Sequence, residues 1–307
     1  MSRAIILVNP RSGSATGQVA ATIGRLVELL AARGVAATTI PIDATRRRPG
    51  SWRAKLEQDL ANGAGGVYVL GGDGTVLAAA TALIGREVPL GIVPLGTANL
   101  LARDIGMPLA PDDAVRALEG ARIQRIDVGR VNGEPFLCAS MLGLGTTLSR
   151  TREAARGLGW LRLSARLLRK TLWLLVRDPY RWVELDLDGR SSQLCTLGVT
   201  VTNNPLTRSP GLHLRRARLD SGRFGVYGIH RGPFWAQLRL ALRAVQGDWP
   251  DDPQVFGREA QRVEIRGRRS GRITVMNDGE RRRVSLPLVY DILPSALPVF
   301  VPVGGDT

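Results

Sequence analysis

The chain has 307 residues, which suggests two domains, and its 44% hydrophobic and 22% charged residues are ordinary for a globular protein. Its formal net charge of +15 comes from 42 basic and 27 acidic residues, and most of the excess falls after residue 125. Two cysteines and two histidines exclude a disulfide framework and argue against a zinc site.

The positive charge of the second half indicates a polyanionic partner, which could be nucleic acid, a phosphate-bearing substrate or an anionic membrane. The alternative is that the base composition of the genome favoured arginine codons. Nearly all the positive charge is arginine, and Lys55 and Lys170 are the only lysines. No apolar run approaches the roughly 20 residues of a membrane-spanning helix. The apolar start at residues 4–8 is short, as in a strand, and does not resemble a signal peptide, so we expect a cytoplasmic protein.

Strand and helix signals alternate over the first 125 residues. The predicted strands are apolar runs without polar interruption, as in a buried parallel sheet, and the predicted helices have helical spacing of apolar residues. We expect strands at 4–8, 35–42, 66–70 and 90–94, and helices at 18–33, 52–61, 76–84, 98–105 and 111–120. This order predicts an N-terminal, doubly wound, Rossmann-like α/β domain over residues 1–127, with ligands at the carboxyl ends of its strands.

The second half is rich in strand signals separated by tight turns. We expect strands at 125–129, 135–139, 182–187, 194–202, 223–229, 262–265, 273–276 and 283–288, a long basic helix at 151–177 and a helix near 233–246. This pattern predicts an all-β, C-terminal β-sandwich domain over residues 128–307. The C-terminal tail, about residues 290–307, is a candidate to return to the first domain.

Three turns rich in glycine or asparagine follow three strands of the predicted parallel sheet, so they should converge at one edge. Their glycines permit close backbone approach, and their free N–H groups beside a helix start form an anion cradle. The predicted cofactor-binding residues are Asn9, Pro10, Ser12 and Gly13 in the first turn, Gly71, Gly72, Asp73, Gly74 and Thr75 in the second, and Gly96, Thr97 and Asn99 in the third.

Asp73 is the unusual member of this set, because a carboxylate beside phosphates repels them unless a cation such as Mg²⁺ bridges the two. Asp73 is therefore a predicted metal ligand. The alternative is a tight strand–helix turn in which Asp73 only caps the helix. Neither the dinucleotide fingerprint nor the P-loop motif occurs in the sequence.

The motifs NPRSG at 9–13, GGDGT at 71–75 and PLGTAN at 94–99 together resemble those of the diacylglycerol kinase catalytic family. That family includes bacterial lipid kinases and sphingosine kinases within the NAD kinase-like superfamily, and the resemblance covers nearly the whole chain. It implies ATP and Mg²⁺ as cofactors, with ATP bound between an α/β domain and a C-terminal β-sandwich. It also implies phosphorylation of a hydroxyl group on a diacylglycerol-like or sphingoid lipid.

The resemblance further implies a catalytic Asp-Gly-Glu turn late in the second domain, and Asp278–Gly279–Glu280 matches it. Carried over from the family, Glu280 is the predicted general base on the lipid hydroxyl, with Asp278 the next candidate. A neutral hydroxyl that attacks a phosphoryl group needs a proton acceptor, so the assignment is chemically sound. Taken alone, Asp-Gly between two strands is a hairpin turn.

Two positions depart from the family pattern. Leu100 and Ser221 stand where many members have aspartate, at positions that belong to a structural Mg²⁺ network in bacterial diacylglycerol kinases. Asp220 is the remaining candidate ligand, with a turn cap as its alternative. We predict that no separate structural Mg²⁺ lies beside Asp220.

Basic and apolar residues alternate along 160–177, where Trp160 and Trp173 accompany Arg166, Arg169 and Lys170. Such a helix can lie on an anionic membrane, or it can pack on a core with a solvated basic face. We expect a lipid substrate and peripheral contact with an anionic membrane, and a homodimer is left open.

Four rival functions compete with this one. A sugar kinase of the phosphofructokinase type also uses a GGDG-like loop, but the β-rich second half argues against it. An NAD kinase shares the GGDG motif, but the second domain lacks a Thr/Ser/Gly-rich nicotinamide-binding stretch. A non-catalytic nucleotide- or lipid-binding regulator would not need Glu280. A nucleic-acid partner is not expected, because stacking platforms and recognisable DNA-binding motifs are missing from the sequence.

Overall fold

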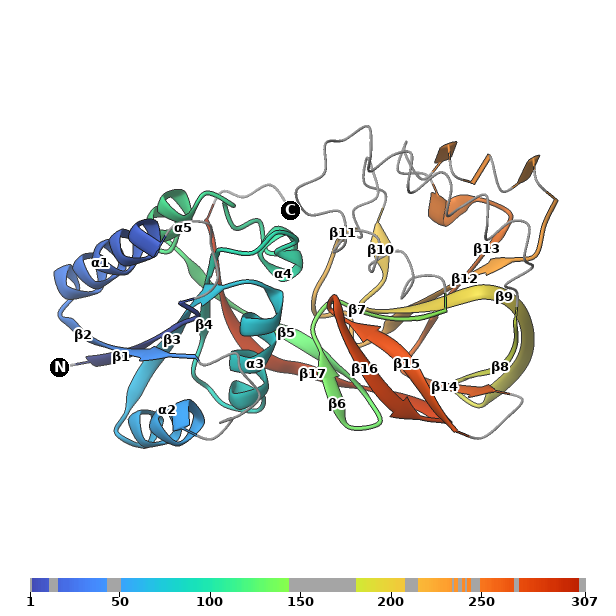
Figure 1. Cartoon of the computed structure of the whole chain (residues 1–307), viewed down its shortest axis with the longest axis horizontal. Helices are drawn as coiled ribbons and strands as arrows, with labels where there is room; N and C mark the ends of the chain where they lie inside the picture. Colours follow the sequence, from blue (N-terminus) through green and yellow to red (C-terminus); the bar gives the residue numbers. More distant parts are fainter. Residues whose placement is uncertain are drawn as a thin grey trace. The chain divides into compact units, whose positions relative to one another are not determined.

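The computed structural model describes residues 2–10, 16–42, 51–143, 181–207, 215–233, 235–236, 239–240, 242–243, 249–267 and 271–303. The chain divides into two compact units: Met1–Val128 together with Pro294–Thr307, and Gly129–Leu293. The first is an α/β unit and the second is rich in β-strands, so the predicted fold class is confirmed (Figure 1).

The first unit is built on a parallel sheet in the order β2-β1-β3-β4, and Val299 of β17 pairs with Leu90 at its edge. The strands are β1 (Ser2–Val8), β2 (Val35–Pro41), β3 (Ala64–Gly71), β4 (Leu90–Pro94) and the end of β17 (Leu288–Val301). The inner strands β3 and β4 are almost wholly buried, as their apolar runs predict.

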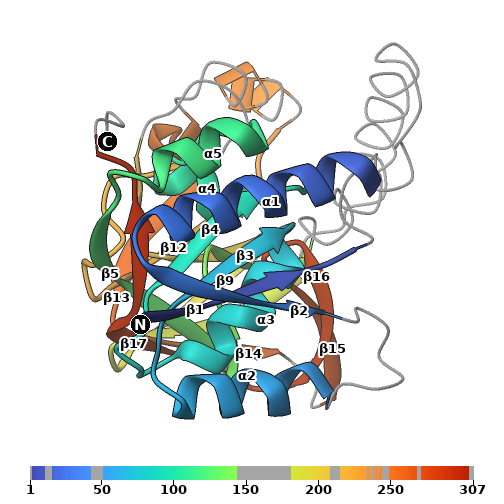
Figure 2. The same ribbon diagram turned by 90° about the vertical axis from the view of Figure 1, so that its left-hand side faces the viewer.

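Helices cover both faces of this sheet (Figure 2). They are α1 (Thr16–Ala32), α2 (Ser51–Ala61), α3 (Asp73–Leu83), α4 (Leu100–Asp104) and α5 (Pro111–Ala117). In Figure 2, α1 and α5 lie on one face and α2 and α3 on the other. The connections from β1 and from β3 leave in opposite directions, so the switch point where doubly wound sheets bind ligands lies between these two strands.

The second unit consists of strands that pair antiparallel in the order β16-β15-β7-β9-β8-β14-β17, with β12 and β13 added through β9, and β5 and β6 through β17. Their bounds are β5 (Arg122–Val131), β6 (Glu134–Phe136), β7 (Ala139–Gly143), β8 (Arg181–Leu187), β9 (Arg190–Asn203), β12 (Phe224–His230), β13 (Val255–Ala260), β14 (Arg262–Gly267), β15 (Arg272–Asn277) and β16 (Glu280–Ser285). Two short strands, β10 (Leu206–Thr207) and β11 (Arg215–Arg216), pair with each other, and the 3-10 helix Trp249–Asp251 precedes β13.

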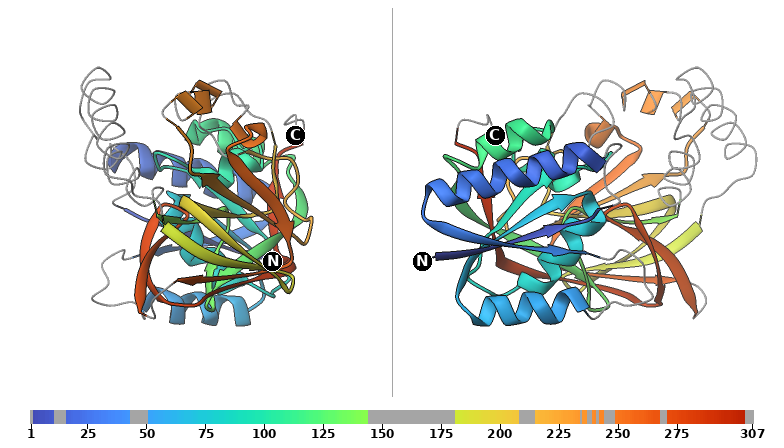
Figure 3. Two further views of the ribbon diagram at one scale, coloured as in Figure 1. Left: turned by 90° about the vertical axis from the view of Figure 1, so that its right-hand side faces the viewer. Right: turned by 60° about the vertical axis from the view of Figure 1, so that its left-hand side comes forward.

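Figure 3 shows the strands of this unit curving around one core. At its centre the rings of Phe136, Phe224 and Tyr290 pack with centroids 6.0–6.3 Å apart, in stacked and edge-on arrangements. All three are fully buried, and aromatic clusters of this kind are worth more than their buried area alone. This core supports β7 and β15, the strands that lead into the candidate site.

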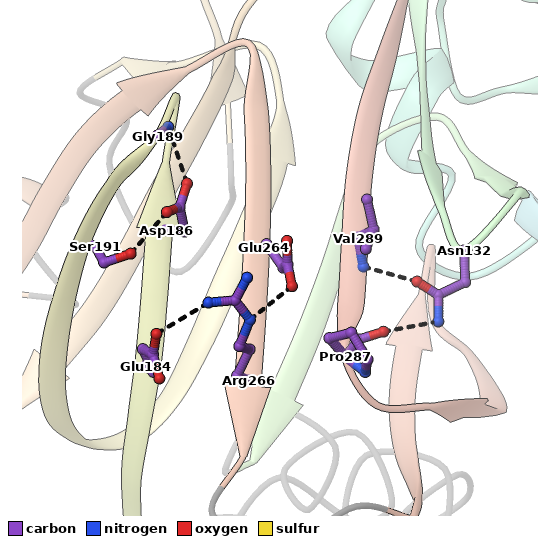
Figure 4. A network of polar contacts seen from close by, with 9 residues as sticks. All are labelled: Asn132, Glu184, Asp186, Gly189, Ser191, Glu264, Arg266, Pro287 and Val289. Carbon is purple, nitrogen blue, oxygen red and sulfur yellow. Dashed lines mark hydrogen bonds and ion pairs between the residues drawn. The ribbon is translucent and has the colours of Figure 1, made fainter.

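Polar side chains tie the outer strands together (Figure 4). Arg266 on β14 bonds to Glu184 on β8 and to Glu264 on its own strand. The Asn132 side chain donates to the carbonyl of Pro287 at 3.1 Å and accepts from the N–H of Val289 at 2.7 Å. These contacts fix the register where the chain turns between strands.

Several predicted elements differ from the observed ones. The predicted strand at 135–139 spans the break between β6 and β7, and β13 and β17 were not predicted. The predicted strand at 283–288 begins three residues early as β16, so Glu280 lies on the strand and not in the turn. Within the described residues no helix is long and apolar enough to cross a membrane. The basic helix predicted at 151–177 lies outside those residues, as does much of the one at 233–246.

Candidate functional site

Two of the predicted turns meet at the switch point of the parallel sheet. Asn9 follows β1, and its backbone N–H donates to the carbonyl of Leu70 on β3 at 3.1 Å. Its side-chain Nδ2 donates to Oγ1 of Thr75 at 3.3 Å. The first turn is thereby bonded to the first turn of α3. Ser12 and Gly13 lie outside the described residues.

The second and third predicted turns touch through two glycines. A Cβ placed on Gly96 would lie 2.6 Å from Cα of Gly72, and one placed on Gly72 would lie 3.2 Å from Cα of Gly96. The N–H of Leu95 also donates to the carbonyl of Gly71 at 2.9 Å. Only glycine allows this backbone approach, which explains why both turns need it. The structure thus brings all three predicted turns together.

The Asp73 carboxylate links these two turns directly. It accepts hydrogen bonds from the backbone N–H groups of Asn99 at 2.9 Å and Leu100 at 2.5 Å, at the start of α4. Burial raises the pKa of the Asp73 carboxyl above its usual value, whereas these two amides and the Arg103 guanidinium act in the opposite direction. Asp73 therefore has a structural role whether or not it also contacts a metal.

The third turn is further fixed by its own asparagine. Asn99 is buried with a left-handed backbone (φ 50°), and its side chain accepts from the N–H of Gly96 at 3.0 Å and donates to its carbonyl at 2.8 Å. Thr97, at the tip of the turn, is exposed. The hydroxyl of Thr97 is therefore accessible to a ligand, while Asn99 shapes the loop.

These residues fit a nucleotide phosphate. Helix α3 begins after Gly72 without a side-chain cap, so its first N–H groups point out of an uncapped helix start. The Asp73 carboxylate next to them accepts from the N–H groups of Asn99 and Leu100, which offset part of its negative charge. The chemistry of the donors suits an anion, and Asp73 is available for a cation that accompanies it.

The second unit carries the predicted catalytic turn, Asp278–Gly279–Glu280, between β15 and β16. Asp278 and Gly279 both have positive φ, 47° and 85°, as a tight hairpin of this type requires. The Asp278 carboxylate accepts three backbone hydrogen bonds, from Leu137 at 2.6 Å, Cys138 at 2.7 Å and Ala139 at 2.9 Å. Asp278 is 5% exposed, so its carboxylate is held inside the unit.

Burial raises the pKa of the Asp278 carboxyl to about 6, against the lowering effects of the three amides and of the Arg216 guanidinium. A carboxylate whose oxygens already accept three hydrogen bonds is poorly placed to take a proton from a substrate. The geometry favours a holding role for Asp278 and leaves Glu280 as the candidate base.

Glu280 is the accessible carboxylate next to the turn, at the first position of β16. Its side chain is 43% exposed and accepts a hydrogen bond from Arg282 at 2.7 Å. Glu280 and Arg282 lie on the same face of β16, because side chains two residues apart on a strand point to the same side. Arg282 can therefore orient the Glu280 carboxylate while leaving it open to a substrate.

Two family models match the chain. The diacylglycerol kinase catalytic domain matches residues 3–131, and the YegS C-terminal NAD kinase beta sandwich-like domain matches residues 149–301. Residues 3–131 are a diacylglycerol kinase catalytic domain. The predicted resemblance to this family is confirmed, and the chain matches about a third of the length of the first two curated relatives.

Curated relatives carry lipid-kinase names, and solved structures share the fold. The probable lipid kinase YegS-like protein of Pseudomonas aeruginosa is 42% identical over 102 residues, a match that spans 33% of this chain and 33% of that protein. The diacylglycerol kinase of Bacillus subtilis is 26% identical over 275 residues, 86% of each chain. The crystal structure of a putative diacylglycerol kinase from Bacillus anthracis str. Sterne shares the fold, with a TM-score of 0.77 at 20% identity over 99% of this chain and 97% of that one.

Asp220 and Ser221, the predicted alternative metal position, make contacts to neighbouring protein side chains. Asp220 pairs with Arg218 at 3.1 Å, and the Ser221 hydroxyl accepts from Nδ2 of Asn204 at 2.9 Å. Among the residues that the structure describes, no cluster of three or more His, Cys, Asp or Glu side chains could hold a metal ion. The Asp220 loop is built from hydrogen bonds of its own side chains.

Two residues of this diacylglycerol kinase-like site were missed by the sequence reasoning. Arg216 and Asn203 are buried, and both bond to the carbonyl of Leu137, whose own N–H is one of the three that hold Asp278. Neither Arg216 nor Asn203 lies in a recognisable motif. Their polar side chains near apolar strands were the one hint that the sequence offered. Tertiary contact alone reveals them.

Proposed function

We propose that this chain is a lipid kinase that transfers the γ-phosphoryl group of ATP to a hydroxyl group of a diacylglycerol-like lipid, with a sphingoid lipid as the alternative acceptor. The observation that carries the proposal is that one chain has both a candidate phosphate-binding site and a candidate proton acceptor. The first unit has three converging turns at a switch point, and the second has an accessible carboxylate on a rigidly held hairpin. The two family models that match the chain support it.

The residues of the first unit would bind and orient the phosphates. The uncapped start of α3 and the hydroxyl of Thr97 supply donors, and Gly72 and Gly96 keep the backbone close. ATP supplies the transferable phosphoryl group when it is bound, and Mg²⁺ supplies the positive charge. Asp73 would hold that cation while it keeps α4 against the second turn.

Glu280 would accept the proton of the lipid hydroxyl as its oxygen attacks. Arg282 orients the carboxylate, and the buried Asp278 keeps the turn in its left-handed conformation. Most of the catalysis in phosphoryl transfer comes from positioning and charge, so the base contributes only part of the rate.

Substitution Glu280→Gln tests the proposal. It keeps size and hydrogen bonding but removes basicity, so ATP binding should survive while transfer to lipid falls by about 10²–10⁴. The matched control is Glu134→Gln, an exposed glutamate at the β5–β6 turn of the same unit, which should retain full transfer. Full turnover by Glu280→Gln would place the base elsewhere.

The acceptor is identified with radiolabelled ATP offered against lipid extracts and NAD in parallel. Label in a lipid and none in NAD supports the proposal, whereas label in NAD favours an NAD kinase. Nucleotide binding without transfer to any acceptor, unchanged in Glu280→Gln, favours a binding regulator.

We further propose peripheral contact with an anionic membrane, because the lipid must be taken from a bilayer and the chain has a net charge of +15. Vesicle binding should weaken with salt and with loss of anionic lipid, at about 1 kcal/mol per interfacial Lys or Arg. Charge reversal at Arg166, Arg169 and Lys170, which lie outside the described residues, should reduce activity on vesicles more than on detergent-dispersed lipid. Equal activity on both would exclude this segment as the contact.

A further inference from the structure

Arg216 is a buried cation to which the proposed reaction gives no role. Its side chain comes from β11 and is 4% exposed. Nη1 donates to the carbonyl of Leu137 at 2.7 Å and to that of Asn203 at 2.6 Å, and Nη2 donates to Sγ of Cys138 at 3.3 Å. Removing a guanidinium from water is costly, so its partners must offset a large desolvation penalty.

The segment 137–139 lies between Arg216 and Asp278. Its carbonyl and thiol groups accept from Arg216, while its three N–H groups donate to the Asp278 carboxylate. The N–H of Asp278 in turn donates to the carbonyl of Ala139 at 2.9 Å. One short segment therefore connects the buried cation to the turn that carries Glu280.

Asn203 reinforces the same segment from β9. Its Nδ2 donates to the carbonyl of Leu137 at 3.2 Å, and its backbone N–H donates to the carbonyl of Cys138 at 2.9 Å. Because Arg216 also binds the Asn203 carbonyl, the guanidinium holds β9 and the 137–139 segment together. Loss of Arg216 would remove one donor from the Asn203 carbonyl and one from the Leu137 carbonyl, which Asn203 Nδ2 also serves.

We propose that Arg216 is a positioning residue for the proton acceptor: it fixes the 137–139 segment, and this segment holds Asp278 so that Glu280 is aligned for transfer. The inference rests on the proposed function. Arg216 acts through Asp278 and needs no contact with ATP or lipid.

The charge of Arg216 matters as well as its hydrogen bonds. The Arg216 guanidinium lowers the pKa of the buried Asp278 carboxyl, which desolvation has raised to about 6. The elements that meet here carry further titratable or charged side chains among the described residues. They are Cys138 in the segment, Arg215 on β11, Arg190 and Cys195 on β9, Arg272 on β15, and Glu280, Arg281, Arg282 and Arg283 on β16. Without the guanidinium, Asp278 would take up a proton at higher pH, and a neutral carboxyl accepts from the three N–H donors more weakly than a carboxylate.

The test uses the full chain with three substitutions. Arg216→Gln and Arg216→Met remove the charge, the first keeping a donor and the second keeping bulk, and Arg216→Lys keeps the charge. Arg215→Gln, the exposed neighbour on the same strand, is the matched control. Hydrogen exchange of the Leu137, Cys138 and Ala139 amides and the pH profile of kcat are measured on each.

We expect the three amides of the wild type to lose protection as the pH falls through about 6, and those of the neutral variants to lose it at higher pH. The kcat of the neutral variants should fall by about 10- to 100-fold with an unchanged KM for ATP, since misplacement of a catalytic group costs rate. Arg216→Lys should restore the wild-type pH of amide protection and part of kcat. Arg215→Gln should match the wild type throughout.

The proposal is overturned if a folded neutral variant keeps wild-type amide protection at every pH, or if its only defect is a raised KM for ATP. If one neutral variant fails to fold, the other gives the decision, because the two preserve different features of arginine. An inactive wild type would refute the proposed function, yet the exchange measurement would still support or overturn the link from Arg216 to Asp278.

Discussion

The carboxylate of Asp73, at the start of α3, accepts a hydrogen bond from the backbone N–H of Leu100, at the start of α4, over 2.5 Å. A second bond comes from the N–H of Asn99 at 2.9 Å. Asp73 of the second turn therefore fixes the position of the third turn through these two hydrogen bonds. This adds a structural role to the metal role predicted for Asp73 from the sequence.

Asp73→Asn should separate these two roles. An amide oxygen can accept from one N–H, but its NH₂ group would face the other, so we expect a loss of roughly 1–3 kcal/mol in unfolding free energy and a raised KM for ATP. If Asp73 also holds Mg²⁺, the Mg²⁺ concentration for half-maximal activity should rise in the same variant. Asp113→Asn, which breaks only a surface pair with Arg116, is the control. A wild-type melting temperature and KM in Asp73→Asn would contradict the structural role, and an unchanged Mg²⁺ requirement would contradict the metal role.

Gly96→Ala should force the second and third turns apart. The new Cβ would lie 2.6 Å from Cα of Gly72 and 2.7 Å from Oδ1 of Asn99, which real contacts do not allow. We expect weaker ATP binding in a titration and a lower melting temperature. Gly24→Ala on α1 has no atom within 4 Å of the added carbon and should instead stabilise the helix by about 0.5–1 kcal/mol. Equal effects of the two substitutions would show that the close approach is unimportant.

The Asp220 loop should bind no separate Mg²⁺. Asp220 is paired with Arg218, and the Ser221 hydroxyl is bonded to Asn204, so the loop holds its shape through protein contacts. Asp220→Ala should leave the Mg²⁺ dependence of activity unchanged, and EDTA should not lower the melting temperature of the wild type. Anomalous scattering at full occupancy beside Asp220 in crystals soaked with Mn²⁺ would refute this.

The sequence predicted the structure correctly where the local pattern of residues and the tertiary structure agree. Leu90–Pro94 is an uninterrupted apolar run and forms β4 with the predicted bounds. The glycines of the second and third turns were predicted to allow close backbone approach, and Gly72 and Gly96 do touch. In both cases the relevant constraint acts within a few residues, or follows from the shared edge of a parallel sheet.

The sequence did not predict elements in which strand pairing overrides the local preference of the residues. Residues Leu288–Val301 form the long strand β17 although they include Pro294 and Pro298, which usually argue against a strand. The strand β16 begins at Glu280 although its first four residues are charged. It lies at the end of the strand order, and an edge strand tolerates a row of charged residues. The partners of Asp278 are about 140 residues away in the sequence, so no local pattern could reveal them.

The last prediction concerns the pH dependence of stability that Asp278 causes. Its pKa in the folded protein, about 6, lies above the ordinary value of 3.8 that it has in the unfolded chain. Between these values the folded state therefore holds more protons than the unfolded state, and stability falls as the pH rises. At about 1.4 kcal/mol per pKa unit, the contribution lost by pH 6 is roughly 3 kcal/mol.

Asp278→Asn removes this titration, so the free energy of unfolding of the wild type minus that of the variant should decrease from about pH 4 to about pH 6 and stay constant above. Urea denaturation of both proteins across this range measures the difference. Asp186→Asn is the control of opposite sign, because hydrogen bonds from Ser191 and Gly189 lower the pKa of the Asp186 carboxyl. There the same difference should increase with pH below about pH 4. A flat difference for Asp278→Asn would show that its buried carboxyl does not titrate in this range, and would remove the basis for expecting an acid-sensitive catalytic turn.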